Sequence, residues 1–355
     1  MINLINSIRN DYDVYFYSLS RTIKTDLLKK HNIPYFVSNY ISANHTVTVT
    51  NNKEWLLFPF KAIIKFFIII LSTIKLVKFI KYYKFDIIHS NSASISSGFF
   101  AAKICGIKHV WHLREYIYKG QLTYPIFGFN FLRFLISKSD YNIPISEGIK
   151  KFYKVKQLHV YDAVFSKKEV EIAYGNNYNE FILFCGSLGV AKRPEDALFA
   201  FKEISNLYPK LRLKIAGFGA RLPYLKKLAK ELNIDSKVDF LGYVQNTYNL
   251  FKNAKCFLMT STFEGLGRTT IEAMANRCIV VGYNKGGTAE IIKHKETGFL
   301  YNNFNELLIN LKYVLDSNDD SLNIIKDKAF RWALDNCEEK VYQRAISYIY
   351  ESLFV

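Results

Sequence analysis

The stretch that decides the fold runs from Met259 to Leu300 and reads MTSTFEGLGRTTIEAMANRCIVVGYNKGGTAEIIKHKETGFL. An apolar run, Cys256–Thr260, leads into a turn with two glycines, and a helical pattern follows. A second apolar run, Cys278–Val281, stops at two further glycines before another helix. This repeated order of strand, glycine turn and helix is typical of a parallel α/β layer, which binds ligands at the carboxyl ends of its strands.

Two glutamates stand out in this stretch. Glu264 lies in the first glycine turn, and Glu272 lies about one helical turn inside the next helix. A carboxylate can accept two sugar hydroxyls at once. The N–H groups from Gly267 to Thr270, at the start of the helix, suit a phosphate because the first turn of a helix has no acceptors for them. We therefore expect this one segment to hold both a sugar ring and a pyrophosphate.

The letters EGLGRTTIEAM, from Glu264 onward, give the two glutamates an E-x7-E spacing. This segment, with the later VVGYNKGGTAEII and TGFLY, resembles the retaining glycosyltransferases of family 4, which have the GT-B fold. An ordinary Rossmann-like unit with two glutamates near a helix start is the alternative. The flanking glycines, E-A-M and the later G-G-x-x-E, in this order, favour the family.

The resemblance implies an α/β fold with two Rossmann-like domains that face one another across a cleft. Residues 1–165 are expected to form the acceptor-side domain, and residues 166–330 the domain that binds the nucleotide-sugar donor. A linker is expected within Tyr161–Tyr178. Residues 331–355 are expected to form a C-terminal helix that packs back on the amino domain, as part of one long helix over Ser321–Leu353.

The amino-terminal domain departs from the family pattern. The first expected strand is Asp13–Leu19, followed by a second at Pro34–Ser38, and the chain begins near the end of what resembles the family's first helix. The family's first strand and its glycine-rich loop are therefore expected to be absent, through an upstream start codon or a truncated copy. A missing central strand is expected to leave its two neighbours unpaired.

The donor-binding residues are carried over from the family, position by position. Lys192 matches a lysine that contacts the diphosphate, whereas Ser187 stands where the family has an arginine. Arg193, next to Lys192, is expected to compensate for that missing cation. The predicted donor-binding set is Gly186, Ser187, Lys192, Arg193, Gly217, Gly219, Gly242, Glu264, Gly265, Leu266, Gly267, Arg268, Thr269 and Glu272.

The resemblance also gives roles to these residues. Lys192 and the backbone from Gly265 to Thr269 are expected to stabilise the diphosphate leaving group without a metal or other cofactor. Glu264 is expected to hold the transferred sugar, and Glu272 the ribose hydroxyls. His112, at the end of the strand Lys108–Leu113, matches a family histidine that faces the donor; a hydrogen-bonded structural histidine is the alternative.

The predicted catalytic residues are thus Glu264, Lys192 and His112. The acceptor-side candidates are Arg114, Glu115, Ser146 and Glu147. The D-x-D motif at Asp11 and Asp13 is interpreted as a turn before a strand and not as a metal site.

The segment Trp55–Tyr83 is strongly apolar, but its longest uninterrupted apolar run is Phe66–Leu71, too short to span a bilayer. Lysines recur at steps of three and four residues, which predicts a basic amphipathic helix. Two interpretations stay open. The helix either packs in the core with its lysine amines reaching solvent, or lies on a membrane surface.

The composition limits the other possibilities. The chain has 355 residues, enough for two domains, and a net charge of +17. Three interpretations of this charge compete, ranked in this order: codon bias, since the chain is also rich in Ile, Asn, Tyr and Phe; contact with anionic lipid; and nucleic-acid binding, for which no zinc finger, RNP-like segment or basic recognition helix is found. The five cysteines form no C-x-x-C pair and no signal peptide is evident, so a cytoplasmic protein is expected, peripheral on the inner face of the cell membrane.

The resemblance thus implies a metal-independent retaining glycosyltransferase that moves a sugar from a nucleotide-sugar donor, with UDP as the favoured nucleotide, to a glycan or lipid-linked acceptor in bacterial surface polysaccharide synthesis. A catalytically impaired nucleotide-binding or membrane scaffold of the same fold is the alternative. A Rossmann-type oxidoreductase is disfavoured, because no G-x-G-x-x-G turn has an acidic residue at the required distance.

Overall fold

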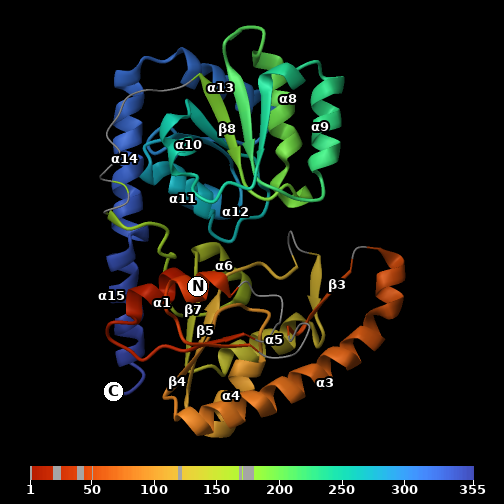
Figure 1. Ribbon diagram of the computed structural model, residues 1–355, viewed down its shortest axis with the longest axis vertical. Helices are drawn as coiled ribbons and strands as arrows, with labels where there is room; N and C mark the ends of the chain where they lie inside the picture. The colour runs from red at the N-terminus through yellow and green to blue at the C-terminus, as the bar shows by residue number, and fades with distance from the viewer. Residues whose placement is uncertain are drawn as a thin grey trace. The chain divides into compact units, whose positions relative to one another are not determined.

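The computed structural model describes residues 2–18, 25–37, 44–49, 51–118, 122–167, 170 and 180–355. The chain divides into two compact units (Figure 1). We name Met1–Asp162 together with Tyr342–Val355 the first unit, and Ala163–Val341 the second unit. The linker expected within Tyr161–Tyr178 lies largely outside the described residues.

The second unit is built on one sheet with the strand order β10-β9-β8-β11-β12-β13, in which every pairing is parallel. The chain enters at β8, adds β9 and β10 on one side, and then crosses to β11, β12 and β13 on the other. The switch point therefore lies between β8 and β11, where a doubly wound sheet binds its ligand. The strands are β8 (Phe181–Cys185), β9 (Arg212–Ala216), β10 (Val238–Gly242), β11 (Cys256–Met259), β12 (Ile279–Tyr283) and β13 (Phe299–Tyr301).

Helices connect these strands and bury their apolar sides against the sheet. Leu198 and Leu225 of two such helices belong to the same buried cluster as Ile182, Leu258 and Val281 of the strands. The elements are η1 (Val190–Lys192), α8 (Pro194–Ile204), α9 (Leu222–Glu231), η2 (Asp235–Lys237), α10 (Tyr248–Asn253), α11 (Arg268–Ala275), α12 (Gly286–Ile291), α13 (Phe304–Asp316) and α14 (Asp319–Cys337).

The described strands of the first unit form three small sheets. Strands β4, β5 and β7 form a parallel sheet of three, β1 pairs with β2 in parallel, and β3 pairs with β6 in antiparallel fashion. The strands predicted at Asp13–Leu19 and Pro34–Ser38 thus pair with one another, as β1 and β2. The strands are β1 (Phe16–Ser18), β2 (Tyr35–Val37), β3 (Thr46–Thr48), β4 (Ile87–Ser90), β5 (Lys108–Leu113), β6 (Thr123–Pro125) and β7 (Tyr141–Pro144).

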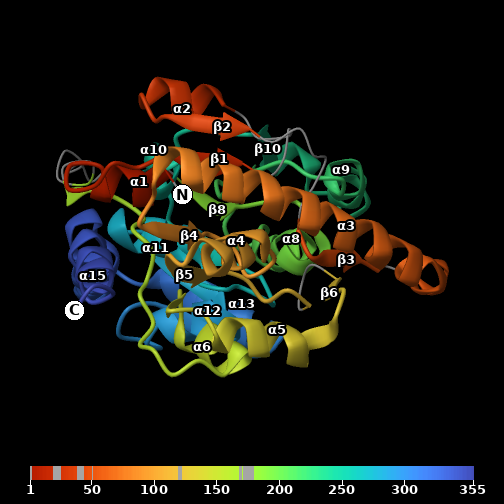
Figure 2. The ribbon, with the colours of Figure 1, turned by 90° about the horizontal axis from the view of Figure 1, so that it is seen from below.

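The helices of the first unit include the longest helix described in the chain, α3, which packs along α4 (Figure 2). Among the described residues, no helix combines the length and the apolar character that crossing a membrane would require. The helices are α1 (Ile2–Ile8), α2 (Asp26–Lys30), α3 (Asn52–Tyr83), α4 (Ser97–Cys105), α5 (Gly128–Ser137) and α6 (Glu147–Tyr153).

The single helix expected over Ser321–Leu353 is wrong, because the chain forms two helices there, α14 and α15 (Glu339–Glu351). Glu338 separates them with an extended backbone, at φ −73° and ψ 148°. Its carboxylate accepts a hydrogen bond from the N–H of Lys340 at 2.8 Å, which satisfies a donor in the first turn of α15. The segment Tyr342–Val355 belongs to the first unit.

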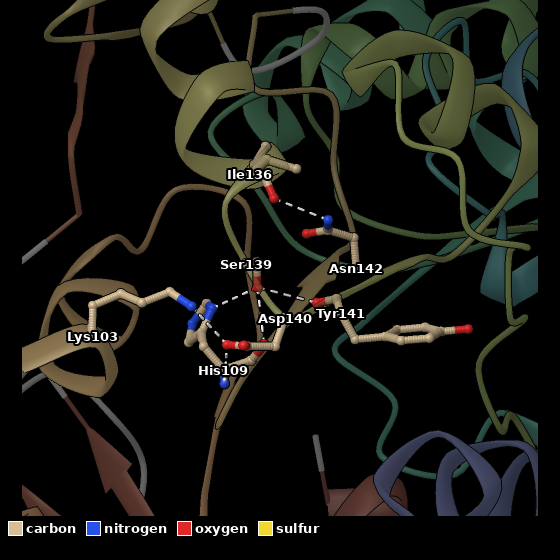
Figure 3. Close-up of polar contacts among 7 residues, drawn as sticks. All are labelled: Lys103, His109, Ile136, Ser139, Asp140, Tyr141 and Asn142. Atoms are coloured by element: carbon tan, nitrogen blue, oxygen red, sulfur yellow. Dashed lines mark hydrogen bonds and ion pairs between the residues drawn. The ribbon is translucent and has the colours of Figure 1, made fainter. Parts of the chain in front are cut away.

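A network of hydrogen bonds joins the amino ends of β5 and β7 (Figure 3). Asp140 accepts hydrogen bonds from the backbone N–H of His109 at 3.0 Å and from Lys103 Nζ at 2.9 Å, and Ser139 contacts the His109 ring at 2.7 Å. A serine, a histidine and an aspartate thus meet, but Asp140 binds the backbone of His109 and not its ring. The cluster lies at the strand ends opposite to those that bind ligands, so we interpret it as structural.

Candidate functional site

The loops after β8 and β11, on the two sides of the switch point, are joined by hydroxyl groups. Thr260 Oγ1 donates to the carbonyl oxygens of Lys192 at 2.7 Å and Arg193 at 2.9 Å. The Thr262 N–H and the Ser261 hydroxyl both donate to the carbonyl oxygen of Ala191, at 3.0 and 3.2 Å. The short helix η1, which carries Lys192, is therefore fixed to the end of β11.

Two residues predicted from separate motifs meet here. Lys192 Nζ donates a hydrogen bond to Glu264 Oε1, and the two groups form an ion pair. The Glu264 side chain is 11% exposed and that of Lys192 is 30% exposed, so the pair lies at the edge of solvent. A partly buried pair of this kind places both charges at one point. Because an ammonium has three N–H donors, Lys192 can bind an incoming anion as well as Glu264.

The glycines of these turns allow loops to approach one another closely. A Cβ at Gly217, whose φ is +149°, would lie 1.8 Å from the carbonyl oxygen of Gly186. A Cβ at Gly219 would lie 2.6 Å from the carbonyl oxygen of Leu188. That these two glycines leave room for a nucleotide stays a prediction, but the contacts between loops already require them.

Gly286 and Gly287, the second glycine pair of the stretch Met259–Leu300, also allow two turns to approach one another closely. A Cβ at Gly287 would lie 2.4 Å from the carbonyl oxygen of Leu266, and one at Gly286 would lie 2.8 Å from that of Glu264. The N–H of Gly287 donates to the Glu264 carbonyl oxygen at 2.9 Å. The turn before α12 thus supports the turn before α11, and it fixes the backbone that carries the Glu264 carboxylate.

The start of α11 differs in one detail from the expectation. Gly267 caps the helix with a left-handed backbone, at φ 88°. The N–H of Thr270 donates to the Gly267 carbonyl oxygen at 2.9 Å, so this N–H is already satisfied within the turn. The N–H groups of Arg268 and Thr269, in the first turn of the helix, remain the ones suited to an anion.

Glu272 lies one turn further along α11 and near the end of β8. Burial raises the pKa of its carboxyl group, against the lowering effects of Arg268 and of a hydrogen bond with Thr247. Burial, with a smaller effect from the Glu272 charge, raises the pKa of the Cys185 thiol to about 12. Glu272 lies on α11, which directly follows β11, one of the two strands at the switch point.

Arg193, Ser187 and Gly242 also belong to the predicted donor-binding set. Arg193 Nη2 forms an ion pair with Asp196 Oδ2 at 2.8 Å, and its guanidinium lies over the Tyr283 ring. Ser187, at the position of the family arginine, is exposed. Gly242 has a φ of +67° and accepts a hydrogen bond from the N–H of Gly217 at 2.7 Å. Arg193 is thus bound to its own helix, which weakens the expectation that it replaces the missing arginine.

In the first unit, His112 is fully buried near the carboxyl end of β5. Its Nδ1 lies 3.2 Å from His89 Nε2, and its Nε2 lies 3.8 Å from Asp162 Oδ1. Burial lowers the pKa of the His112 imidazole well below its usual value, and the charges of Arg114 and His89 add to this effect. His112 is therefore neutral near pH 7 and able to both donate and accept a proton in a hydrogen bond.

Two acceptor-side candidates adjoin this histidine. Arg114 forms an ion pair with Asp162 and donates to Asn91 Oδ1 at 3.0 Å. Glu115 accepts a hydrogen bond from the Ser92 hydroxyl, and burial raises the pKa of its carboxyl group. Arg114 is therefore held by Asp162 and Asn91, whereas Glu115 is held by Ser92.

The other two candidates, after β7, have local partners. Ser146 is the N-cap of α6 and accepts a hydrogen bond from the N–H of Ile149 at 3.2 Å. Glu147 lies in the first turn of α6, and its carboxylate contacts Lys150 at 3.3 Å and His159 at 3.5 Å. Helix capping thus accounts for Ser146.

The structure describes the two units one by one, so the expectation that His112 faces the donor residues stays a prediction. Within the described part of the chain, no group of three or more His, Cys, Asp or Glu side chains is arranged to hold a metal ion. Asp11, of the D-x-D motif, lies in the turn after α1 and accepts a hydrogen bond from Gln343 at 3.1 Å.

Sequence reasoning missed several partners of the predicted residues. Thr260 could have been found, because T-S-T follows directly after a buried strand at the ligand edge. Thr247, Asp162 and His89 gave no such signal, because they are brought to Glu272, Arg114 and His112 from distant parts of the chain.

Part of the chain is similar to a known protein family. Residues 167–331, which make up most of the second unit, match the family described as glycosyl transferases group 1. A Campylobacter jejuni protein is 33% identical over 175 residues; it is named N-acetylgalactosamine-N,N'-diacetylbacillosaminyl-diphospho-undecaprenol 4-alpha-N-acetylgalactosaminyltransferase. An uncharacterized glycosyltransferase of Haemophilus influenzae is 30% identical over 168 residues. These alignments cover 48% and 46% of this chain, and the chain spans about half of each relative, 47% in both cases.

Solved structures match almost the whole chain. HepE from Anabaena, in complex with UDP, has a TM-score of 0.76 at 19% identity, with 99% of this chain and 95% of that chain covered. The lipopolysaccharide outer core galactosyltransferase WaaB, in its apo form, has a TM-score of 0.70 at 17% identity, with 99% and 95% covered. The predicted α/β fold of the GT-B class is confirmed by these neighbours.

Proposed function

We propose that the chain is a retaining glycosyltransferase of family 4 that transfers a sugar from a nucleotide-sugar donor, linked to UDP, to a glycan or a lipid-linked acceptor. The observation that carries this proposal is the contact between Lys192 and Glu264 at the switch point of the second unit. A cation for the leaving group and a carboxylate for the sugar hydroxyls meet where a doubly wound sheet binds its ligand.

The chemistry follows from where charge develops. As the bond between sugar and diphosphate breaks, negative charge grows on the diphosphate, and a fixed cation with helix N–H groups can stabilise it without a metal ion. Lys192 supplies the cation, and Arg268 and Thr269 supply N–H groups from the first turn of α11. Glu264 holds the transferred sugar, and Glu272 accepts the ribose hydroxyls.

The first unit supplies the acceptor side in this proposal. His112 is neutral and has one buried ring nitrogen, Nε2, without a hydrogen-bond partner among the described residues. A neutral imidazole can hydrogen bond a sugar hydroxyl or a phosphate oxygen as the acceptor approaches. Arg114 and Glu115 flank it as further candidates for the acceptor.

The named relatives support the donor and the acceptor class. HepE has been solved with UDP and with UDP-glucose, and the Campylobacter jejuni relative is named for a diphospho-undecaprenol substrate. We infer a UDP-linked donor, a lipid-linked acceptor in bacterial surface polysaccharide synthesis and a peripheral position on the inner face of the membrane for this chain. The charge of +17 favours contact with anionic lipid.

Calorimetry with UDP and GDP, together with transfer rates from UDP-sugars, tests the proposal. Glu272→Ala is expected to raise the dissociation constant for UDP at least about tenfold, because it removes the ribose acceptor. Lys192→Ala is expected to slow transfer about 100-fold, the usual loss when one stabilising group is removed. Lys227→Ala, at a surface lysine that is 77% exposed in the same unit, is the control and should change neither. Unchanged UDP affinity in Glu272→Ala would refute the assignment.

A second candidate function is a nucleotide-binding scaffold with impaired catalysis. The observation that favours it is Ser187, which leaves one cation fewer than the family has, while Arg193 is paired with Asp196. The scaffold predicts tight UDP binding with no transfer and no donor hydrolysis. Ser187→Arg then restores turnover if the missing cation is the cause.

A further inference from the structure

The exposed surface of helix α3 is apolar over most of its length, and most of its exposed lysines lie near the carboxyl end. From Leu56 to Ile74, every exposed residue of the helix is apolar. Lys61 and Lys65, which interrupt the sequence here, are each partly buried and paired: Lys61 pairs with Glu54 of the same helix, and Lys65 donates to Asn44. The helix therefore presents an apolar stripe roughly 28 Å long to its surroundings.

This apolar stripe is too large to be ordinary surface. Its exposed members are Leu56, Leu57, Pro59, Phe60, Ile63, Ile64, Phe66, Phe67, Ile70, Leu71 and Ile74. A contiguous apolar patch of this extent marks contact with a membrane or with another protein.

A cavity of about 390 Å³ opens beside the stripe, between α3, α4, β6 and α5. Phe66, Ile70 and Ile74 of the stripe line it, together with Ile104 of α4 and Phe131 of α5, and all five are partly exposed at its mouth. Its volume is in the range of a pocket for a small ligand, and its lining is almost wholly apolar. Hydrocarbon is the chemistry that such a lining accepts.

One polar group in the cavity wall has no partner. His45 is 5% exposed, and neither of its ring nitrogens has a hydrogen-bond partner among the described residues. Burial lowers the pKa of the His45 imidazole to about 4, with a smaller effect from the nearby charge of Lys65, so the ring is neutral near pH 7. A buried polar group without a partner requires an explanation, and a ligand with one polar end beside a long chain supplies it.

The positive charge at the carboxyl end of α3 favours an anionic lipid as the partner of the stripe. Lys75, Lys78 and Lys81 are exposed on the last turns of α3, and Lys78 lies about five helical turns after Phe60, on the same side of the helix. Apolar side chains followed by lysines on one side suit acyl chains and phosphate headgroups. A second copy of the chain, with a net charge of +17, would be repelled.

We propose that this cavity binds the hydrocarbon chain of the anionic lipid that carries the acceptor, while the stripe of α3 rests in the membrane surface. The proposal rests on the function proposed above, because it identifies the carrier of the acceptor. Bulk lipid needs only the stripe. An apolar cavity with the neutral His45 imidazole in its wall can hold one chain with a phosphate at its end, because the imidazole can donate a hydrogen bond to a phosphate oxygen.

The test measures binding of alkyl phosphates by calorimetry, below their micelle concentrations and without any sugar donor. Affinity is expected to rise roughly fourfold for each methylene added until the cavity is filled. An alkyl trimethylammonium of equal length is expected to bind at least about tenfold more weakly. Binding that does not depend on chain length, or equal binding of the cation, would overturn the proposal.

Three matched variants separate the cavity from the stripe. Ile70→Glu, at the cavity mouth, is expected to abolish alkyl phosphate binding, because Ile70 is 39% exposed and the fold tolerates a change there. Leu56→Glu, on the stripe but outside the cavity, should keep that binding and weaken sedimentation with anionic vesicles. Ile309→Glu, at an exposed position of α13, should change neither. Alkyl phosphate binding that survives Ile70→Glu sinks the assignment of this cavity.

Transfer assays distinguish failure of the inference from failure of the function. If Ile70→Glu raises KM for a lipid-linked acceptor at least about tenfold and leaves KM for a short-chain analogue unchanged, the cavity serves the acceptor. If both KM values change alike, the cavity does not bind the hydrocarbon chain of the acceptor. If no transfer occurs with any variant, the function fails, and the alkyl phosphate series still decides the lipid site.

Discussion

The Thr260 hydroxyl donates a hydrogen bond to the carbonyl oxygen of Lys192 at 2.7 Å, from the end of β11 to the end of η1. Thr260 is 1% exposed, and the same hydroxyl is also 2.9 Å from the carbonyl oxygen of Arg193. Together with the hydrogen bonds of Ser261 and Thr262 to Ala191, this side chain fixes the turn that carries the proposed leaving-group cation.

Thr260→Val is expected to reduce transfer more than it reduces stability. The change keeps the shape of the side chain but leaves two buried carbonyl oxygens without this donor, at a cost of about 1–3 kcal/mol. With Lys192 less firmly placed, kcat should fall about tenfold or more, while UDP affinity, which depends on Glu272, changes little. Thr260→Ser keeps the hydroxyl and should behave like the parent. Equal kcat in the valine and serine variants would contradict this role.

Gly217→Ala is expected to destabilise the second unit strongly. The added Cβ would lie 1.8 Å from the carbonyl oxygen of Gly186, and the φ of +149° is strained for any residue with a side chain. We expect a loss of more than about 3 kcal/mol in urea unfolding. Gly189→Ala is the control, because its Cβ would meet nothing within 4 Å and its φ is unstrained. Similar losses in the two variants would show that contacts between loops do not explain Gly217.

The buried histidines of the first unit should make the protein sensitive to acid. Burial lowers the pKa to about 4 for His45 and to about 3 for His89 and His109. The unfolded chain binds a proton at each of these positions below about pH 6.5, and the folded chain does not. The free energy of unfolding is therefore greatest above pH 6.5. As the pH falls toward the lowered pKa values, each histidine should reduce it by about 1.4 kcal/mol per pH unit.

Urea unfolding at pH 7.5 and pH 5.5 measures this effect. His45→Phe, which removes one titrating ring without breaking a hydrogen bond, should lower the pH dependence by about the contribution of one group. A pH dependence that His45→Phe does not reduce would show that His45 is protonated in the folded state.

Binding of a UDP-sugar should weaken at acid pH through Glu272. Burial raises the pKa of this carboxyl group, so it takes up a proton at a higher pH than an exposed glutamate does, and a protonated group accepts fewer hydroxyl hydrogen bonds. A UDP-sugar is the right probe, because the terminal phosphate of UDP itself titrates. Glu272→Gln should bind more weakly and lose this pH dependence. A glutamine variant that keeps the full dependence would assign the titration to another group.

The alternation of apolar runs and glycine turns was enough to predict every strand of the second unit's sheet except the edge strand Phe299–Tyr301. The strands Phe181–Cys185 and Val238–Gly242 and the helix Tyr248–Asn253 agree with the structure residue for residue. These elements are short, and a glycine or an asparagine marks the end of each: Gly186 follows the first strand, Gly242 ends the second, and Asn253 ends the helix. The single helix over Ser321–Leu353 failed, because the break at Glu338 depends on tertiary contacts with Phe165 and on a carboxylate cap.

The sequence by itself determined which residues of the second unit come together, because E-x7-E and the turn with Lys192 follow two strands that meet at the switch point. Only the tertiary structure decided what each is bound to. Thr260 reaches Lys192 and Asp162 reaches Arg114 across long stretches of chain, which no local spacing encodes. The direction of α3 was decided in the same way. Lys61 pairs with Glu54 of the same helix and Lys65 with Asn44, whereas the residues left exposed from Leu56 to Ile74 are all apolar.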